Sequence, residues 1–276
     1  MNLNNQWGYL QSDRFVRANE QGGRGVMDEA AYRAFYESVG QKNGWDFSRL
    51  QVETRGEAWD FSREVLQRCQ PTALMLDIGT GGGEAVLQYA SQTLLLIGID
   101  HSVAMIEKAK ENLVSSPHRN VRFFHMDSFA LVFPNEFFDL VTSRHAPFDP
   151  WEVARVLKPG GVFLSQQVSE HDKYKLKNAF GRGQCYGDED GVLRDSYLRE
   201  LQAAGLAVEV REYDAEEYYQ SVQDLLFLLS HTPIIPAFGE CADDFKRLHT
   251  YVKKNQTEQG IRTNAKRFLL IGTKRQ

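Results

Sequence analysis

A glycine-rich turn carries the strongest chemical signal in this sequence. The apolar run 73–78, which contains Asp77, leads into residues 79–83 (GTGGG), and a helix is expected from Glu84. In an open α/β sheet, ligands bind at the carboxyl ends of the strands. Glycines there let the backbone turn tightly and approach a ligand closely, and the free N–H groups of the following helix favour a negative group such as a carboxylate. The segment therefore predicts a ligand-binding loop.

The spacing of the glycines argues against a nicotinamide or flavin site. The dinucleotide fingerprint requires G-x-G-x-x-G. Counted from Gly79, the third glycine falls on Glu84; counted from Gly81, it falls on Val86. Because both frames fail, an oxidoreductase of this type is disfavoured.

The elements that must position this loop alternate from residue 72 onward. Strands are expected at 73–78, 94–99, 121–125, 137–143, 162–168, 206–213 and 267–272, and helices at 84–90, 103–114, 151–157, 195–204, 216–230 and 245–254. Alternation at this spacing predicts βαβ units and an α/β fold with a doubly wound, mostly parallel sheet of seven strands. Further polar residues then follow the strand ends, at Asp100, Asp127 and Ser143.

In its order of motifs the chain resembles the class I S-adenosylmethionine-dependent methyltransferases, of the kind called methyltransferase type 11. Asp77, Gly79, Gly81 and Gly83 form the D-x-G-x-G-x-G of the family's first motif, Asp100 closes the second strand, Asp127 follows the third, and LKPGG precedes the fifth. The resemblance covers residues 72–168 closely and the remainder loosely. It implies the Rossmann-like methyltransferase fold and S-adenosylmethionine as the cofactor.

The resemblance also implies roles for single residues. Asp77 would lie near the methionine amino group, Asp100 would bind the ribose hydroxyls, whose two donors match the two oxygens of a carboxylate, and Asp127 would contact the adenine amino group. The complete predicted cofactor set is Asp77, Gly79, Thr80, Gly81, Asp100, His101, Met105, Asp127, Ser128 and Ser143. Structural alternatives stay open: a turn or cap for the acids, simple turn chemistry for the glycines, and helix core for Met105.

His145 is the candidate catalytic residue. A general base is needed only if the methyl acceptor arrives protonated, and a histidine near its ordinary pKa of about 6.5 can take that proton; a purely local hydrogen bond is an equal alternative. Ser143–His145 replace the start of the N/D-P-P-Y/F motif of family members that methylate nitrogens, which counts against that subgroup. Arg144 either anchors a substrate carboxylate or phosphate or pairs with Asp149 or Glu152.

Two segments outside the alternating pattern are expected to cover the substrate. Residues 1–70 contain two helical patterns, at 28–39 and 57–69, and predict an N-terminal helical lid. Residues 71–276 then form the S-adenosylmethionine-binding domain, with a helical insertion at about 215–260 before the last strand. Both segments are rich in rings, which suit an aromatic or apolar substrate although core packing explains most of them: Trp7, Tyr9, Tyr32, Tyr36, Trp45, Trp59, Tyr213, Tyr218 and Tyr219.

Composition limits the function classes further. Hydrophobic residues make up 42% of the 276-residue chain and the net charge is only −5, which excludes a disordered chain. No apolar stretch approaches the roughly 20 residues of a membrane span, no secretory signal is visible, and three separated cysteines suggest neither a zinc site nor a disulfide framework. A cytoplasmic protein is expected.

The charge is unevenly distributed. Residues 246–276 hold nine Lys/Arg and one acid, so they carry 9 − 1 = +8. This segment is either a solvated helix and edge strand or a basic wall that attracts an anionic substrate. The leading interpretation is therefore a methyltransferase acting on a small molecule. An RNA methyltransferase, which the acidic total opposes, and a cofactor-binding protein without transfer activity are the alternatives. The oligomeric state stays undetermined, since Leu225–Leu229 can be core or a dimer face.

Overall fold

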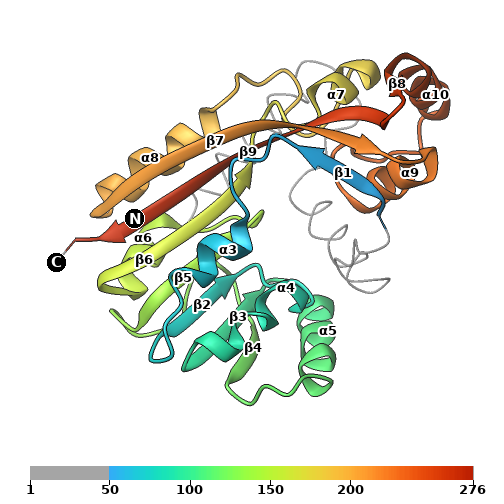
Figure 1. The fold of residues 1–276 in the computed structure, drawn as a ribbon. Helices are drawn as coiled ribbons and strands as arrows, with labels where there is room; N and C mark the ends of the chain where they lie inside the picture. The colour runs from blue at the N-terminus through green and yellow to red at the C-terminus, as the bar shows by residue number, and fades with distance from the viewer. Residues whose placement is uncertain (1–49, 276) are drawn as a thin grey trace.

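The computed structural model describes residues 50–275, so the helix expected at 28–39 lies outside the described part of the chain. Within it, the strands form one mixed sheet in the order β1-β7-β9-β6-β5-β2-β3-β4, with β8 paired to β9 (Figure 1). The strands are β1 (Val52–Arg55), β2 (Leu74–Ile78), β3 (Leu95–Asp100), β4 (Val121–His125), β5 (Phe138–Arg144), β6 (Leu157–Val168), β7 (Leu206–Tyr219), β8 (Gln256–Thr257) and β9 (Gly260–Lys274).

Helices cover both faces of the parallel part of this sheet. They are α3 (Phe61–Leu66), α4 (Glu84–Leu87), the 3-10 helix η1 (Ala90–Gln92), α5 (Val103–Val114), α6 (Pro150–Val156), α7 (Tyr174–Phe180), α8 (Val192–Ala203), α9 (Val222–His231) and α10 (Asp244–Asn255). One apolar core lies between the sheet and α3, α4 and α5. The other lies between the sheet and α6 and α8. Alternate residues of a strand point to opposite faces, so Met75 enters the first core and Leu76 the second. The predicted doubly wound α/β fold is confirmed.

Single side chains explain where several helices begin. Ser102 caps α5 by accepting a hydrogen bond from the N–H of Met105, and Asp149 caps α6 by accepting from the N–H groups of Trp151 and Glu152. These bonds satisfy donors that the first helical turn leaves without partners. Because each capped helix directly follows the loop after a strand, the caps hold the loops at the carboxyl edge of the sheet.

The predicted strand count of seven was too low, because the described residues form nine strands. Strand β7 continues to Tyr219 and β9 begins at Gly260, so the helix expected from residue 216 begins at Val222 instead. The sequence did not reveal this extension of β7 because Glu217, a charged residue, occupies a buried position between Ala215 and Tyr219. Its carboxylate lies 2.6 Å from the Nζ of Lys173. A buried ion pair of this kind interrupts the apolar alternation by which a strand is recognised.

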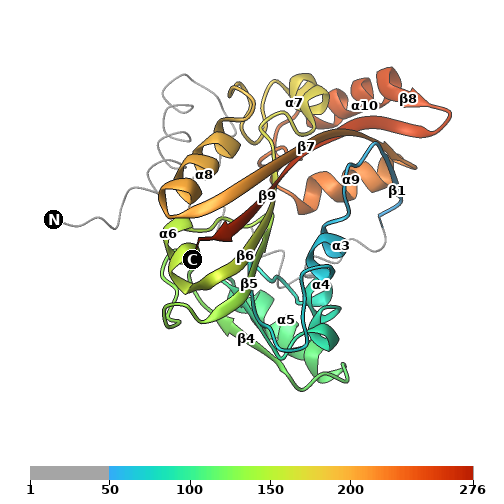
Figure 2. The same cartoon turned by 60° about the vertical axis from the view of Figure 1, so that its left-hand side comes forward.

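Strands β7 and β9 extend beyond the carboxyl edge of the parallel sheet. Their pairing continues for six residues past the level of Val168, from Asp214–Lys266 to Tyr219–Ile261, which corresponds to about 20 Å. The helices α7, α9 and α10 gather around the far ends of these strands in both views (Figures 1 and 2). The insertion therefore projects from the edge where the strands β2 to β6 end.

The inserted helices have an apolar core of their own. It contains Leu225, Leu228 and Leu229 of α9 together with Leu248 and Tyr251 of α10. The two alternatives left open for 225–229 are thus decided in favour of core, since Leu225 and Leu229 are buried within the chain itself. Among the described residues, none of the helices is long and apolar enough to cross a membrane.

Candidate active site

The direction of the chain reverses between β2 and β5. From β2 the chain runs outward through β3 to β4, and it then returns to place β5 on the other side of β2. Both strands are parallel, with Ile78 opposite Ser143. In open α/β sheets, ligands bind in the crevice beyond such a switch point. A ligand-binding site is therefore expected at the loops that follow β2, β3 and β5.

The glycine loop lies at this crevice and contacts both neighbouring strand ends. The N–H groups of Gly79 and Thr80 both donate to the carbonyl of Ile99 in β3. Gly79 has φ +74°, and a Cβ on it would lie 2.1 Å from the Cβ of Ala146, in the loop after β5. Only glycine fits there, because a side chain would meet both backbone strain and a collision. The loop after β5 is thus packed directly on the glycine loop.

Asp100 ties the glycine loop to the end of β3. Its Oδ2 accepts a hydrogen bond from the N–H of Gly81 at 2.9 Å, and its Oδ1 accepts from the N–H of Ser102 at 2.9 Å. The cap of α5 is Ser102, so the alternative that Asp100 itself caps this helix is not what the structure shows. Each carboxylate oxygen has acceptor capacity for a further donor. Asp100 can therefore hold the loop and still bind a diol.

Asp77 is a buried acid in the middle of the sheet. Its Oδ1 accepts from the hydroxyl of Thr142 at 2.6 Å, and the residue lies within β2 and caps no helix. Loss of hydration by burial raises the pKa of Asp77 to about 6, while the Thr142 hydrogen bond opposes this rise. A buried carboxyl of raised pKa next to a crevice is suited to bind a cationic group, which would restore its charge.

The other predicted cofactor residues lie near this crevice with different surroundings. Met105 is buried, while His101 is exposed, with its Nδ1 3.5 Å from an Asp100 oxygen. Asp127 is exposed and accepts from the N–H of Phe129, in a local turn, and Ser128 is half-buried beside it. Ser143 is buried and donates to the carbonyl of Ala146. The structure thus gathers Asp77, Gly79, Gly81 and Asp100 closely, whereas the contacts of Asp127 and Ser143 are those of turns.

A cavity of about 150 Å³ lies at the end of β5, just before the loop that packs on Gly79. It lies between the carboxyl ends of β5 and β6, the overhanging part of β7 and β9, and the start of α3. The lining residues are Glu57, Trp59, Asp60, Phe61, Arg144, His145, Gln166, Tyr213, Glu217, Ala265 and Arg267. Since Ala146 packs on Gly79, the residues just before it, Arg144 and His145, connect the glycine loop with this cavity.

A hydrogen-bonded chain along the cavity determines the protonation of His145. The indole Nε1–H of Trp59 donates to Oε1 of Gln166 at 2.8 Å. The Nε2 group of the same amide then faces Nε2 of His145 at 3.1 Å. Indole N–H and the amide NH₂ are donors only, so the His145 Nε2 must accept. His145 is therefore neutral with its proton on Nδ1, and Nδ1 makes no hydrogen bond to the part of the chain that the structure describes.

The charges around His145 reinforce this neutral state. Enclosure of the ring by protein, followed by the positive charges of Arg267 and Arg144, holds the pKa of His145 well below its usual value. The side chain keeps an exposed surface because it borders the cavity. His145 also has φ +57°, a conformation that costs a non-glycine residue free energy and that is common at functional sites.

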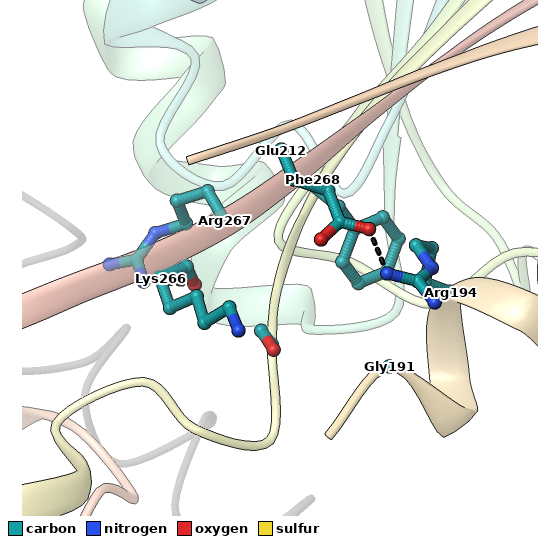
Figure 3. Close-up of a pocket in the computed structure, with 7 residues that line it drawn as sticks. Gly191, Arg194, Glu212, Lys266, Arg267 and Phe268 are labelled. Atoms are coloured by element: carbon teal, nitrogen blue, oxygen red, sulfur yellow. Dashed lines mark hydrogen bonds and ion pairs between the residues drawn. The ribbon is translucent and has the colours of Figure 1, made fainter. Parts of the chain in front are cut away.

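A buried network of charges supports the wall of the cavity. The Nζ of Lys173 bonds Glu217, and Glu217 also accepts from the hydroxyl of Tyr219. Arg267 forms an ion pair with Asp172. Figure 3 shows Lys266 and Arg267, neighbours on β9, directing their side chains to different sides of the strand. Both residues line the separate, smaller pocket drawn in Figure 3, where Lys266 forms an ion pair with Asp190. Of the two, Arg267 also lines the cavity between β5, β6 and α3.

Sequence reasoning missed the residues Gln166, Lys173, Glu217 and Arg267. One signal was present for Gln166, because Gln166 and Gln167 interrupt an apolar strand with two polar residues that turn out to be buried. The partnership of Lys173 with Glu217 joins positions 44 residues apart. No local pattern indicates such a pair, since either residue alone is typical of an exposed surface.

Comparison with known proteins bears on the chemistry of this site. The profile of a family described as "Methyltransferase domain" matches residues 75–161. The uncharacterized methyltransferase YcgJ of Bacillus subtilis is 28% identical over 237 residues, covering 75% of this chain and 87% of that protein. A sterol 24-C-methyltransferase of Yarrowia lipolytica is 27% identical over 267 residues, covering 80% and 68%. The crystal structure of the Bacillus YcgJ protein shares the fold, with a TM-score of 0.59 and 24% identity over 78% of this chain and 98% of that one.

Proposed function

The chain belongs to the class I S-adenosylmethionine-dependent methyltransferases, and on that basis we propose that it methylates a small molecule held in the cavity beside the glycine loop. The observation that carries the proposal is the contact between Gly79 and Ala146. It places the loop after β2 against the loop after β5, and Arg144 at the end of β5 and His145 in that loop both line the cavity. A methyl donor on the first loop and an acceptor in the cavity would then be neighbours.

The residues of the glycine loop fit S-adenosylmethionine. The loop comes close to β3 and to Ala146, and a Cβ at Gly79 would collide with Ala146. Asp77 is a buried acid suited to an ammonium group, and Asp100 offers two oxygens suited to the ribose hydroxyls. We assign Gly79, Thr80 and Gly81 to the backbone around the methionine part. His101, Met105, Asp127, Ser128 and Ser143 complete the proposed site on the adenine and ribose side and beside the loop.

Methyl transfer requires the protein mainly to position the two reactants. When bound, S-adenosylmethionine supplies a methyl group on a positively charged sulfur. The chain then has to hold the acceptor atom in line with that methyl group and to exclude water, and such alignment is a large part of catalysis in two-substrate reactions. Trp59, Tyr213 and the overhanging strands enclose the cavity for that purpose.

His145 is the residue that we propose to touch the acceptor. Its Nε2 is occupied by the Gln166 amide, so removal of a proton at this atom requires that hydrogen bond to break. The Nδ1–H group is a donor. Because Nε2 is occupied and Nδ1 carries the proton, we propose that His145 donates a hydrogen bond to the methyl acceptor and is not the general base predicted from the sequence.

The cover of the site is also part of the proposal. We assign a lid role to residues 1–70, of which β1 and α3 are described, and to the insertion at about 215–260. The start of α3 lines the cavity, and the insertion projects from the same edge of the sheet. A cytoplasmic location stays a prediction.

Calorimetric titration with S-adenosylhomocysteine tests the cofactor site. We expect the folded protein to bind it and Asp100→Ala to weaken binding at least tenfold, or about 1.4 kcal/mol. Asp243→Ala is the matched control, because Asp243 is exposed and its side chain makes no capping bond to α10. Equal affinity of both variants would contradict the assignment of Asp100.

Methyl transfer is then sought with a panel of acceptors, and cofactor binding without any product would favour a protein that binds but does not transfer.

A further inference from the structure

Arg144 is a cation in the cavity without an acidic partner among residues 50–275. It ends β5, is exposed, and has its guanidinium 5.8 Å from the ring centre of Phe61. The acids nearest in sequence are engaged elsewhere. Glu152 forms an ion pair with Arg155 at 2.8 Å, and Asp149 accepts from two N–H groups at the start of α6. The structural alternative for Arg144, pairing with one of these acids, is therefore not realised.

The other charged groups that line the cavity form no ion pair with Arg144, and the buried Asp77 interacts with it only beyond ion-pair distance. Arg267 pairs with Asp172. Glu217 is bound by Lys173 and by the hydroxyl of Tyr219. Asp60 accepts the N–H of Arg63 and caps α3.

Glu57 is exposed at the rim of the cavity. It forms no ion pair with Arg144 within the described residues. Within the described residues, the Arg144 guanidinium, two residues before Ala146, is thus left to attract a negative ligand.

His145 adds a second donor beside Arg144. The Gln166 amide keeps the proton of His145 on Nδ1. The charges that act most strongly on the His145 ring are positive, from Arg267 and Arg144. A neutral imidazole donor in a positive field favours an anion over a neutral or cationic group.

Aromatic rings also line the cavity. The rings of Trp59 and Tyr213 lie with centroids 4.4 Å apart, and both residues line the cavity together with Phe61. Such rings offer apolar contact area to part of a ligand. The cavity therefore combines aromatic rings with the cation of Arg144 and the imidazole of His145.

We propose that the methyl acceptor is an anionic small molecule whose carboxylate or phosphate is bound by Arg144, with the Nδ1–H of His145 as second donor. This assignment rests on the proposed function, since it concerns the acceptor cavity of the same site. It makes Arg144 the residue that determines specificity for charge. An arginine binds either anion through two parallel hydrogen bonds, so a lysine in its place retains the charge but loses the paired geometry.

Binding of matched probes tests the proposal. Benzoate, phenyl phosphate and the uncharged benzamide are titrated into the full chain, with and without saturating S-adenosylhomocysteine, and followed by ligand-observed NMR. We expect at least one of the two anions to bind tenfold or more tightly than benzamide. Arg144→Gln should abolish this preference, and Arg144→Lys should retain part of it. The two anions together distinguish a carboxylate site from a phosphate site.

The control is Arg119→Gln, which removes the same charge from an exposed position of the loop before β4. It should leave the preference unchanged. Equal affinity for the anions and benzamide, no detectable binding of either anion, or an unchanged preference in Arg144→Gln would each overturn the proposal.

Cofactor binding is read separately. If S-adenosylhomocysteine fails to bind while the anion preference persists in the free protein, the proposed function falls and the anion site stands. If S-adenosylhomocysteine binds equally to the wild type and Arg144→Gln but no anion is preferred, the anion site falls and the proposed function stands.

Discussion

At the scale of single residues, Asp77 is a carboxyl group buried within a strand, a position that apolar residues usually occupy. Its pKa is about 6 in the folded protein because burial removes hydration, against about 3.9 in an unfolded chain. The folded state therefore holds this proton more tightly. The corresponding stabilisation is present below pH 4 and is lost as the pH rises to about 6, by roughly 3 kcal/mol. A residue kept at such a cost is a candidate for binding rather than for packing.

We expect the affinity for S-adenosylhomocysteine to rise with pH until the pH passes about 6. A cationic amino group beside Asp77 stabilises the carboxylate, so binding below that pH must release a proton, and each pH unit below the pKa weakens binding by up to tenfold. Calorimetry from about pH 4.5 to about pH 7.5, a range that brackets the raised pKa of Asp77, measures this dependence. Asp77→Asn should bind weakly at every pH without the slope. The same slope in that variant would assign the titration to another group.

At the scale of elements, the glycine loop depends on two conditions that can be separated. Gly79 and Gly160 have nearly the same φ, +74° and +75°. A Cβ at Gly79 meets Ala146 at 2.1 Å, whereas a Cβ at Gly160 meets nothing within 4 Å. The two positions therefore share the backbone strain of a left-handed residue and differ in the collision.

We expect Gly160→Ala to lower the free energy of unfolding by about 1–2 kcal/mol through strain alone. Gly79→Ala should lower it by a further 1–3 kcal/mol or so, because the loop and Ala146 must move apart. Urea unfolding measures both. Binding of S-adenosylhomocysteine should be lost in Gly79→Ala and retained in Gly160→Ala. A similar cost for both variants would mean that the contact with Ala146 relaxes freely.

At the scale of the whole molecule, the fold pairs part of the positive charge of the C-terminal segment with acids. Four of the nine basic residues of segment 246–276 form ion pairs with acids elsewhere in the chain: Arg262 with Glu216, Lys266 with Asp190, Arg267 with Asp172, and Lys274 with Glu136. Two of these partners come from the segment between β6 and α8. The segment is thus closer to the structural alternative than to a continuous basic wall.

We accordingly expect only weak binding of RNA. Fluorescence anisotropy with a labelled single-stranded oligonucleotide should give dissociation constants no tighter than the nonspecific range of about 10⁻⁴ to 10⁻⁶ M at physiological salt. Tight binding that falls steeply as salt is added would instead indicate many phosphate contacts. That result would favour the RNA methyltransferase alternative over a small-molecule acceptor.

The local sequence determined the parallel half of the molecule. Helix α5 and strand β4 were predicted at their observed bounds, because an amphipathic period and a capping serine are properties of neighbouring residues. The positions of Asp77, Gly79 and Asp100 at strand ends follow from the same pattern, which also implied the cofactor. Their chemistry is local, since a glycine turn and the acid after a strand need no distant partner to be recognised.

Only the tertiary structure decided the acceptor side. The extension of β7, the pairing of Lys173 with Glu217, and the Trp59–Gln166–His145 chain join residues far apart in sequence. The partner of a charged or polar residue determines whether it can be buried, and that partner is set by the fold. Arg144 and Arg155 illustrate the difference. Arg155 pairs with Glu152 three residues away in α6, a contact that local sequence can indicate, whereas only the arrangement of the strands places Arg144 at the cavity.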